Sequence, residues 1–382
     1  MGRVTLFLAG DVMTGRGIDQ VLAFPSEPTL YESHVHDARA YVELAERANG
    51  PIPRSVGAAY VCGDMLGALE RLGPSVRIAN LETSVTTSST PWPDKGIHYR
   101  MNPANVACLT AARLDCCVLA NNHVLDWGRA GLVETLAALA AAGIRTAGAG
   151  TDAAAAARPA VIELADAARV LVFACGSETS GIPRAWRAGK WRAGVELLDD
   201  LSLATARRLE RRIERVRRRR DVVVVSVHWG GNWGYAIPAE QREFAHALID
   251  GGAADVVHGH SSHHAKGVEV YRGKPIIYGC GDFLNDYEGI DTSPGYRGDL
   301  ALGYFVTVDA GSGALVELKI QPAQMRRFGL RDVSPADAAW LKSMLDREGA
   351  QFGTGADLDV DGTLLLRWGA EPAAGAAGDA AV

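Results

Sequence analysis

The sequence lacks an apolar run long enough to cross a membrane. Its apolar stretches, such as residues 222–227, fall far short of the roughly 20 residues that a spanning helix needs. The stretch at residues 4–9 is equally short and leads directly into Gly10-Asp11, so it does not have the form of a signal peptide. We therefore expect a protein with no membrane span that works in the cytoplasm.

Lysine is scarce as well, and basic charge does not dominate. Only six of the 39 basic residues are lysines, and the net charge is −6. Nothing in this balance attracts a polyanion, so we expect no nucleic-acid partner. The run at 217–220 is four arginines, but it ends an amphipathic stretch and is typical of a solvated helix face.

Several motifs that would define a function are missing. There is no Walker A sequence, no GxGxxG after a strand and no GxSxG elbow, which argues against kinase-like, Rossmann and serine-hydrolase functions. The six cysteines show neither CxxC nor zinc-ribbon spacing, and Cys116-Cys117 lies in an apolar stretch. Buried free thiols in a reducing compartment are the expected state.

Short apolar stretches alternate with longer helix-like ones. This alternation predicts an α/β fold in which helices cover β-sheets. The expected strands lie at 4–9, 76–79, 116–120, 170–174, 222–227, 255–258 and 275–278, and expected helices at 130–142, 201–220 and 240–250.

The chain of 382 residues is long enough for one large domain with an appendage. We expect a main domain over 1–310, an α+β extension over 311–369 and a disordered tail over 370–382. The extension should hold a helix that begins at Ser334-Pro335, with Pro335 at the first helical position. A hairpin should follow, with Asp361-Gly362 at its turn.

Polar residues follow five of the predicted strands. Because ligands of open α/β sheets bind beyond the carboxyl ends of the strands, loops from several strands can bring these groups to one site. The groups are Asp11; Asn80-Leu81-Glu82; Asn121-Asn122-His123; His228; and His258-Gly259-His260-Ser261-Ser262-His263-His264.

These residue types indicate a metal centre. Two carboxylates, an amide and at least three imidazoles, without a thiolate, suit Mn²⁺, Fe, Zn²⁺ or Mg²⁺. Six or so ligands are too many for one tetrahedral ion, so we expect two divalent ions that share a bridging carboxylate and water. Such a pair activates the water and polarises a phosphoryl or carbonyl oxygen.

The motifs together resemble the CapA family. They are Gly10-Asp11-Val12-Met13-x-Gly15-Arg16, Asn80-Leu81-Glu82, Asn121-Asn122-His123-x-x-Asp126-x-Gly128, His228-Trp229-Gly230 and Gly259-His260-x-x-His263, followed by a segment from Val268 to Phe283. The resemblance covers about residues 4–310. It implies the calcineurin-like metallophosphoesterase fold, a sandwich of mixed β-sheets flanked by helices, and a link to poly-γ-glutamate capsule synthesis.

The resemblance also implies roles for individual residues. Glu82 would be the bridging carboxylate. His123 would protonate the leaving group, and Asp126 would orient its ring. The implied metal ligands are Asp11, Glu82, Asn122, His123, His228, His260 and His263.

The sequence departs from the related patterns at two places. Met13 stands where metallophosphoesterases have a metal-binding histidine, which would leave one ion a ligand short. Asp282 stands where the family usually has asparagine. Capsule-export members also carry a membrane anchor that we do not find here, so we expect soluble chemistry rather than a direct part in polymer export.

The expected substrate is anionic, and it could contain glutamate. Arg16 and Arg100 are candidate anion-binding residues. Trp229 and Trp233 are candidate pocket walls, and packing in the core is an equally open alternative for both. The favoured function is a metal-dependent, hydrolase-like reaction at a phosphoryl or acyl centre. Two alternatives stay open: a non-catalytic accessory subunit of a polyglutamate or envelope assembly, and an amide-forming tailoring enzyme of a biosynthetic pathway.

Overall fold

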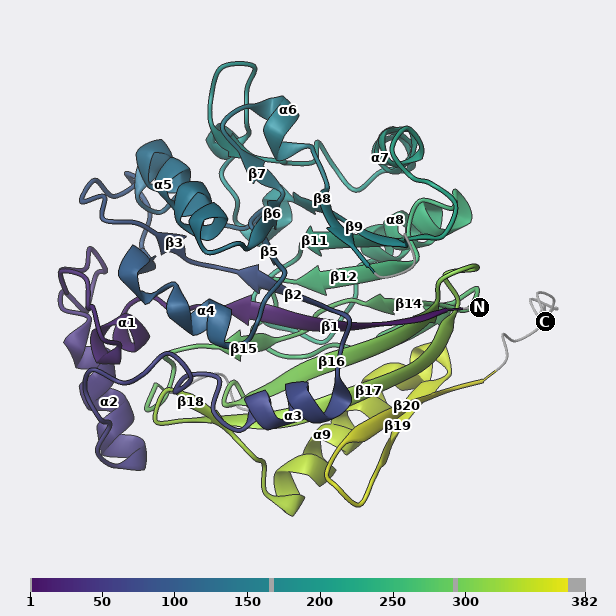
Figure 1. The fold of residues 1–382 in the computed structure, drawn as a ribbon. Coiled ribbons are helices and arrows are strands. Elements are labelled where there is room, and N and C mark those ends of the chain that lie inside the picture. Colours follow the sequence, from purple (N-terminus) through teal and green to yellow (C-terminus); the bar gives the residue numbers. More distant parts are fainter. Residues whose placement is uncertain (1, 165–167, 291–294, 370–382) are drawn as a thin grey trace, which may run out of the picture.

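Two β-sheets face each other in the computed structural model, which describes residues 2–164, 168–290 and 295–369 (Figure 1). The larger sheet has ten strands. Eight of them follow the order β19 (Thr354–Leu358), β20 (Leu364–Trp368), β17 (Leu315–Arg326), β16 (Leu300–Asp309), β1 (Arg3–Val12), β2 (Val76–Leu81), β5 (Cys116–Val118) and β6 (Arg145–Ala147). The other two are β15 (Asp282–Leu284), which pairs with β1, and β18 (Gly329–Arg331), which pairs with β17.

The smaller sheet has six strands. Their order is β13 (Val268–Tyr271), β14 (Lys274–Ile277), β12 (Val256–His260), β11 (Asp221–His228), β9 (Arg169–Gly176) and β8 (Ala160–Glu163). Two short pairs stand apart, namely β10 (Gly194–Val195) with β7 (Ala149–Gly150) and β3 (Ser84–Val85) with β4 (Arg100–Met101).

Helices cover the outer faces of both sheets. Five helices pack on the larger sheet: α1 (Gly17–Val21), α2 (Arg39–Asn49), α3 (Met65–Leu72), α4 (Ala107–Ala111) and α5 (Gly128–Ala141). On the smaller sheet lie α7 (Leu203–Glu214) and α8 (Ala239–Asp250). Two further helices are α6 (Ala153–Ala156), against β7, and α9 (Pro335–Gly349), against β19.

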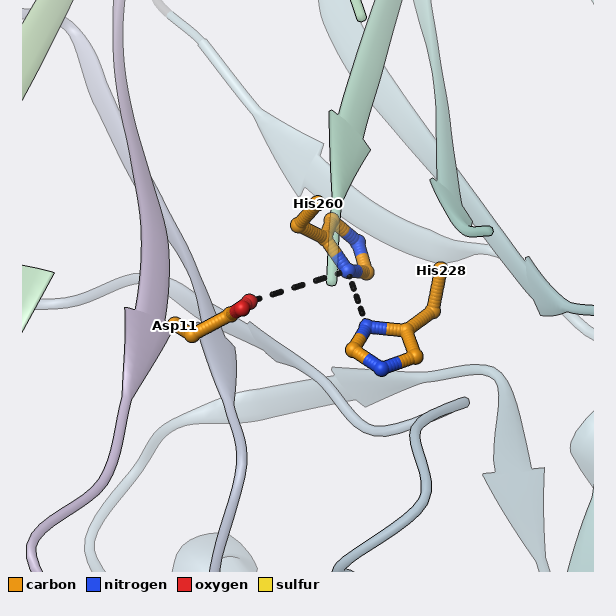
Figure 2. A group of neighbouring side chains, drawn as sticks. All are labelled: Asp11, His228 and His260. Carbon is orange, nitrogen blue, oxygen red and sulfur yellow. Dashed lines mark hydrogen bonds and ion pairs between the residues drawn. The ribbon is translucent and has the colours of Figure 1, made fainter. Parts of the chain in front are cut away.

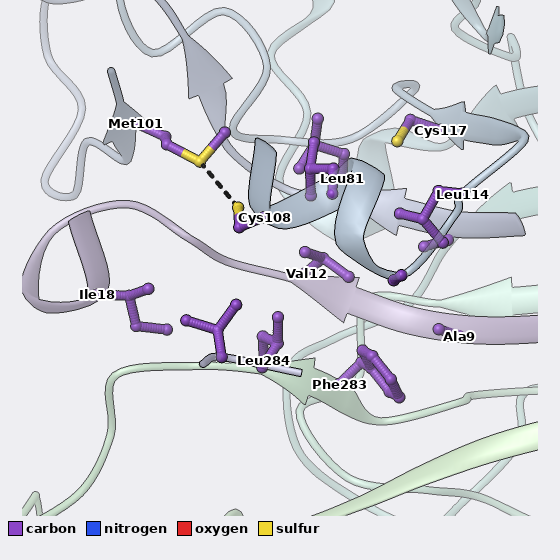
Figure 3. Close-up of a cluster of buried hydrophobic side chains, with 14 of the residues drawn as sticks. Ala9, Val12, Ile18, Leu81, Met101, Cys108, Leu114, Cys117, Phe283 and Leu284 are labelled. Carbon is purple, nitrogen blue, oxygen red and sulfur yellow. Dashed lines mark hydrogen bonds between the residues drawn. The ribbon is translucent and has the colours of Figure 1, made fainter. Parts of the chain in front are cut away.

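Strand β1 shows why the sequence forms these layers. Alternate side chains of a strand point to opposite faces of its sheet. Leu6 and Leu8 accordingly belong to the core between the sheets, whereas Phe7 and Ala9 belong to the core under the helices. Figure 3 shows part of the second core, where Ala9 and Val12 of β1 lie among side chains from the neighbouring strands and helices.

The predicted α/β sandwich is confirmed, and the expected strands and the helices expected at 130–142 and 240–250 are present within a few residues of their predicted bounds. The helix predicted over 201–220 ends earlier, at Glu214, so the run of arginines at 217–220 lies beyond its end. Arg220 has a φ of 73°, outside the helical region, where the chain turns into β11. The parallel strands run in two sets. These are β1, β2, β5 and β6 in the larger sheet, and β9, β11, β12 and β14 in the smaller one. Their carboxyl ends are therefore available to build one site, as the clustering of polar residues predicts.

The predicted boundary near residue 311 lies in the turn between β16 and β17, which pair along most of their length. The predicted helix is α9, with Ser334 as its N-cap, and the predicted hairpin is β19 and β20. Both join the larger sheet or pack on it, so the extension adds to the main architecture. The division into domains stays a prediction, and the predicted tail lies outside the described residues.

All six cysteines are buried and form no disulfide, as the sequence predicts. Within the described ranges, no helix has both the length and the apolar character needed to span a bilayer.

Candidate metal centre

The predicted ligands gather where the two sets of parallel strands end. Asp11 lies near the end of β1 because Gly10 forms a bulge: the register between β1 and β2 shifts between Ala9 and Asp11. A bulge re-aims the side chain that follows it. A Cβ on Gly10 would lie only 1.8 Å from the carbonyl oxygen of Gly281, so only glycine fits this approach of β1 to the segment before β15.

One group of possible ligands consists of Asp11, His228 and His260. All three are buried, and each offers a ligand atom within 4.8 Å of the others. The Nδ1 atoms of the two imidazoles face each other at 2.7 Å, and His260 Nδ1 lies 4.0 Å from Asp11 Oδ1 (Figure 2). The first residue comes from the larger sheet and the other two from the smaller one, so this group lies between the sheets.

Neighbouring groups set the tautomers of both rings. His228 Nε2 lies 3.0 Å from Asn122 Oδ1, an acceptor, so this nitrogen carries the proton. A relay sets His260, because His258 Nε2 lies 3.0 Å from the carbonyl oxygen of Ala9 and its Nδ1 accepts from Ser226. Ser226 Oγ then accepts from His260 Nε2, 2.8 Å away. Both Nδ1 atoms are left with lone pairs that point at one place.

Both of these imidazoles are neutral at pH 7. Burial, together with the neighbouring histidines, keeps the pKa of His228 and the pKa of His260 well below the usual value. Two facing lone pairs repel each other unless a cation or proton lies between them. Neutral imidazoles of this kind are the form that binds a metal.

Carboxylates complete the wall of the centre. Asn80 Nδ2 donates to Asp11 Oδ1 at 2.7 Å and to Glu82 Oε2 at 3.2 Å, which holds both side chains toward the site. Burial and the nearby Asp282 raise the pKa of Asp11 to about 7, and burial with Asp11 raises the pKa of Glu82. The site thus holds more acidic groups than it can ionise without a cation.

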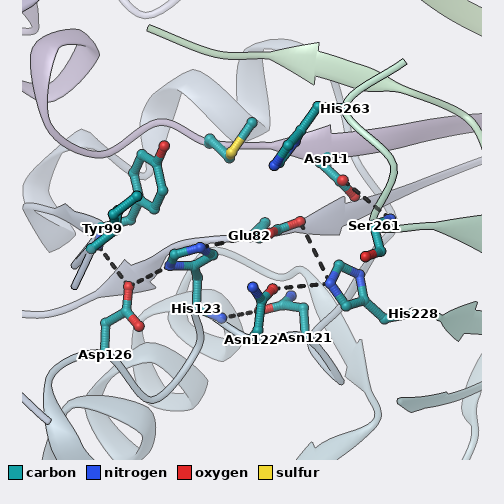
Figure 4. Close-up of polar contacts among 12 residues, drawn as sticks. Asp11, Glu82, Tyr99, Asn121, Asn122, His123, Asp126, His228, Ser261 and His263 are labelled. Carbon is teal, nitrogen blue, oxygen red and sulfur yellow. Dashed lines mark hydrogen bonds and ion pairs between the residues drawn. The ribbon is translucent and has the colours of Figure 1, made fainter. Parts of the chain in front are cut away.

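His123 lies at the edge of the same site, opposite Asp11 (Figure 4). Its Nδ1 lies 2.7 Å from Asp126 Oδ2, and its Nε2 lies 3.8 Å from Glu82 Oε1. Lys95 Nζ pairs with the other oxygen of Asp126 at 2.5 Å and lies 2.9 Å from His123 Nδ1. Burial, partly offset by Asp126, lowers the pKa of His123 to about 4, so the ring is neutral at pH 7.

The two adjacent asparagines have different contacts. Asn121 is buried, donates to Asn80 Oδ1 and the carbonyl oxygen of Leu81, and accepts from the backbone N–H of His123. Asn121 therefore fixes the loop that carries His123. Asn122 contacts His228 Nε2 through its Oδ1, so in this structure its side chain orients that ring, and its role as a metal ligand stays a prediction.

A second group of possible ligands consists of Asp11, His263 and Asp282. His263 Nδ1 lies 2.8 Å from Asp282 Oδ1, and Asp282 Oδ2 accepts from Asn285 Nδ2 at 2.9 Å. In the sequence, Asp282 stands out only as a departure from the family pattern. Its position on β15 beside β1 makes it part of the site, and no local sequence pattern reveals that pairing.

The three residues predicted to bind substrate are each held by protein groups. Arg16 is buried and bonds to Asp286 and Glu32. Arg100 donates to the carbonyl oxygens of Ser88 and Glu27. Trp229 is 2% exposed, donates to the carbonyl oxygen of Tyr278 and packs in the core outside the smaller sheet. These contacts are structural, and a role in substrate binding stays a prediction.

A half-buried aromatic cluster, formed by Trp233, Tyr235 and Tyr296 around His264, borders the metal centre. Trp233 lies 5.5 Å from His263 and stacks on His264 at 6.1 Å, measured between ring centroids. Tyr235 and Tyr296 extend the cluster beyond His264. The sequence indicates Trp233 only as one of two candidate wall residues. It gives no sign of the tyrosines, because they come from loops far apart in the chain.

The residues present suit a divalent metal. The site combines converging imidazole lone pairs with buried carboxylates, and among the described residues no thiolate takes part. Such oxygen and nitrogen donor sets suit Mn²⁺, Fe, Zn²⁺ or Mg²⁺.

Comparison with known proteins identifies the family of the chain. Residues 5–287 match the family described as bacterial capsule synthesis protein PGA_cap, and this span contains every predicted ligand. The chain belongs to this family. The CapA resemblance seen in the motifs is thereby confirmed.

Several proteins similar to this chain have names that refer to polyglutamine, PGA or capsule synthesis. A probable polyglutamine synthesis accessory protein of Mycobacterium tuberculosis (strain CDC 1551 / Oshkosh) is 45% identical over 351 residues, which are 92% of each chain. The PGA biosynthesis protein CapA of Bacillus subtilis (strain 168) is 27% identical over 283 residues, covering 72% of this chain and 62% of that protein. The capsule biosynthesis protein CapA of Bacillus anthracis is 29% identical over 236 residues, covering 60% and 53%.

Proposed function

We propose that this protein is a metal-dependent enzyme of polyglutamate or capsule synthesis, with two divalent ions, that acts on a phosphoryl or acyl centre of an anionic substrate. The observation that carries the metal part is the pair of imidazole lone pairs, His228 Nδ1 and His260 Nδ1, that converge beside Asp11. The family and the names of the relatives support the biological setting.

The residues divide into holding and proton-transfer roles. Asp11, Glu82, His228, His260 and His263 would hold the metal ions, with Asn122 beside them. Divalent metals in such a site lower the pKa of bound water and polarise the oxygen of the reacting group.

His123 is the proton-transfer residue in this proposal. Asp126 accepts the hydrogen bond from Nδ1, so the neutral ring presents its Nε2 lone pair to the site. Nε2 can accept a proton from the attacking group and return it to the leaving group. Lys95 neutralises Asp126, which keeps that carboxylate a hydrogen-bond acceptor rather than a proton acceptor.

Metal analysis tests this proposal. Purified protein should contain more than one equivalent of transition metal, and the double variant Asp11→Ala/His228→Ala should lose most of it. His246→Ala is a matched control. His246 of α8 pairs with Glu269 of β13 and is not one of the proposed ligands. Full metal content in the double variant would contradict the site assignment.

An activity screen follows the metal analysis. The metal-loaded protein should turn over a phosphoester or a γ-glutamyl amide, whereas Asp11→Ala/His228→Ala should not. An amide-forming reaction, the tailoring alternative, would appear in the same screen as exchange, in which an added amine takes the γ-glutamyl group and the original amine is released.

The name of the Mycobacterium relative favours a second candidate, a non-catalytic accessory subunit whose metals are structural. Complementation separates the two. If His123→Asn supports polymer synthesis in cells as well as the wild type, and the wild type has no activity in the screen, the accessory function is correct.

A further inference from the structure

Two aspartates stand side by side on neighbouring strands. In the parallel pairing of β1 with β15, Asp11 is the register partner of Asp282. Side chains of paired residues on adjacent strands point to the same face of the sheet, and like charges in such positions destabilise it. The chain therefore places two carboxylates together where a sheet normally avoids them.

Among the described residues, only histidines form ion pairs with these carboxylates. Asp11 and Asp282 are 0% and 3% exposed. Within the part of the chain that the structure describes, neither they nor the neighbouring Glu82 forms an ion pair with a lysine or arginine; their charged partners are histidines. The nearest basic side chains are committed elsewhere, Arg16 to Asp286 and Lys95 to Asp126. His263 can offset at most one of these three negative charges. Buried charges that are not fully offset are costly, so an additional cation would stabilise this place.

His263 completes a set of donors around this place. It offers a ligand atom within 4.8 Å of those of Asp11 and Asp282, and Figure 4 shows its ring beside Asp11. Asp11 also belongs to the group with His228 and His260, so the two groups meet at this one carboxylate.

We propose that Asp282 is a metal ligand that, with Asp11 and His263, forms a cation position of harder character than the one at His228 and His260. This inference rests on the proposed metal-dependent function. Two carboxylates and one imidazole favour Mn²⁺ or Mg²⁺, whereas one carboxylate and two imidazoles suit Zn²⁺ or Fe. The acidic residue at 282 thus supplies a donor on the side of the site where Met13 supplies no imidazole.

Asp282 could have a different role, and the test must distinguish that role from metal binding. Its Oδ1 lies 2.8 Å from His263 Nδ1, so it could act only by orienting that ring. Asp282→Asn distinguishes the roles, because the amide oxygen still accepts this hydrogen bond while the charge is lost. Loss of an outer partner costs about 10–100-fold in metal affinity, so loss of a true ligand should exceed this range.

The experiment measures Mn²⁺ and Zn²⁺ stoichiometry on the full chain by titration and elemental analysis. Wild type should bind two metal equivalents. D282N should lose one Mn²⁺ equivalent, with more than about 100-fold weaker Mn²⁺ binding, and should keep one tight Zn²⁺. H260Q should show the opposite pattern and keep the Mn²⁺ equivalent.

A second variant guards against misfolding. Asn285 donates to Asp282 and to the carbonyl oxygen of Gly298. The exchange D282N/N285D keeps a donor and an acceptor in contact between the two side chains, gives up the bond to Gly298 and moves the charge away from Asp11. It should show the same selective loss of Mn²⁺ and a wild-type circular dichroism spectrum. D299N, at a carboxylate paired with Arg297 away from Asp11, should change neither stoichiometry.

The outcomes are distinct. If wild type binds no metal, the proposed function fails. If wild type binds metal and D282N and the exchange variant bind Mn²⁺ with unchanged stoichiometry and less than 100-fold weaker affinity, the proposed function stands and Asp282 is no ligand.

Discussion

His123 is held on one side only. Its Nδ1 atom is fixed by Asp126, whereas its Nε2 atom has no hydrogen-bond partner among the described residues and faces Glu82. An imidazole held in this way has one defined tautomer and one reactive nitrogen. Tyr99 packs edge-on against the ring at 4.6 Å and restricts its rotation.

We predict that His123→Asn keeps the fold and most of the metal but lowers turnover by about 10²–10⁴-fold. The loss should be smaller on esters with activated leaving groups, because these leave without protonation. Steady-state kinetics on a pair of substrates that differ only in the leaving group measures this. A variant that loses metal would show instead that His123 is a ligand, and full activity on the poor leaving group would exclude proton transfer by His123.

Asp126→Asn should be milder than His123→Asn, since Asp126 acts by orienting the ring. It should lower kcat with little change in KM. Equal losses in the two variants would mean that Asp126 takes part directly, and an unchanged kcat would remove it from the mechanism.

Single residues also show what a sequence can and cannot predict. The ligand types and their order along the chain were visible, because each directly follows a predicted strand. The burial of Arg16 was not, since its partner Asp286 lies 270 positions away. The contact of Asp282 with the site was equally hidden, because only the pairing of β15 with β1 creates it.

At the scale of elements, the bulge at Gly10 sets the position of the whole centre. It shifts the register between β1 and β2, whose pairing resumes at Asp11, and brings the chain close to Gly281. A side chain there would push β1 and the segment before β15 apart, and with them Asp11 and Asp282.

We therefore predict that Gly10→Ala destabilises the protein by about 1–3 kcal/mol and weakens metal binding. Gly96→Ala is the control, since a Cβ at Gly96 meets no atom within 4 Å. Chemical denaturation and metal titration of both variants check this. Wild-type values for Gly10→Ala would show that the close approach is not required.

Helix α9 begins at a cap that the sequence already indicated. Ser334 Oγ accepts from the backbone N–H of Asp337 at 3.1 Å, and Pro335 occupies the first turn. Ser334→Ala should lower the free energy of unfolding by about 1 kcal/mol. Ser343→Ala, in the exposed middle of the same helix, should be neutral or slightly stabilising. Equal effects of the two changes would contradict the capping role.

Over the whole molecule, the metal centre joins the two sheets. Asp11 and Glu82 come from the larger sheet and its loops, and His228 and His260 from the smaller one. His258 already links them through its bond to the carbonyl oxygen of Ala9. Bound metals would add further links across the interface.

We predict that removal of metal by a chelator lowers the melting temperature and that added metal restores it. A ligand at 100 times its Kd stabilises the native state by about 2.7 kcal/mol for each independent site. Differential scanning calorimetry with parallel metal analysis measures the change. An unchanged melting temperature after confirmed metal removal would contradict the proposed metal centre.

The layered architecture was predictable because apolar runs and amphipathic stretches record burial locally. The arrangement of the C-terminal strands was not. The sequence shows a helix and a hairpin after residue 311, but it does not show that β17 and β20 pair within the larger sheet. Strand pairing depends on contacts between distant segments, which no local pattern encodes.

The central place of β1 has a consequence for how the protein is made. Residues 3–9 pair on one side with β16, whose residues leave the ribosome almost three hundred positions later. At about 5–20 residues per second, the nascent chain carries that apolar edge unpaired for on the order of 15–60 s. An open strand edge is a template for aggregation, so the growing chain needs shielding during synthesis. Asp282 also emerges late, so the cation position proposed at Asp11, His263 and Asp282 can fill only when translation is well advanced.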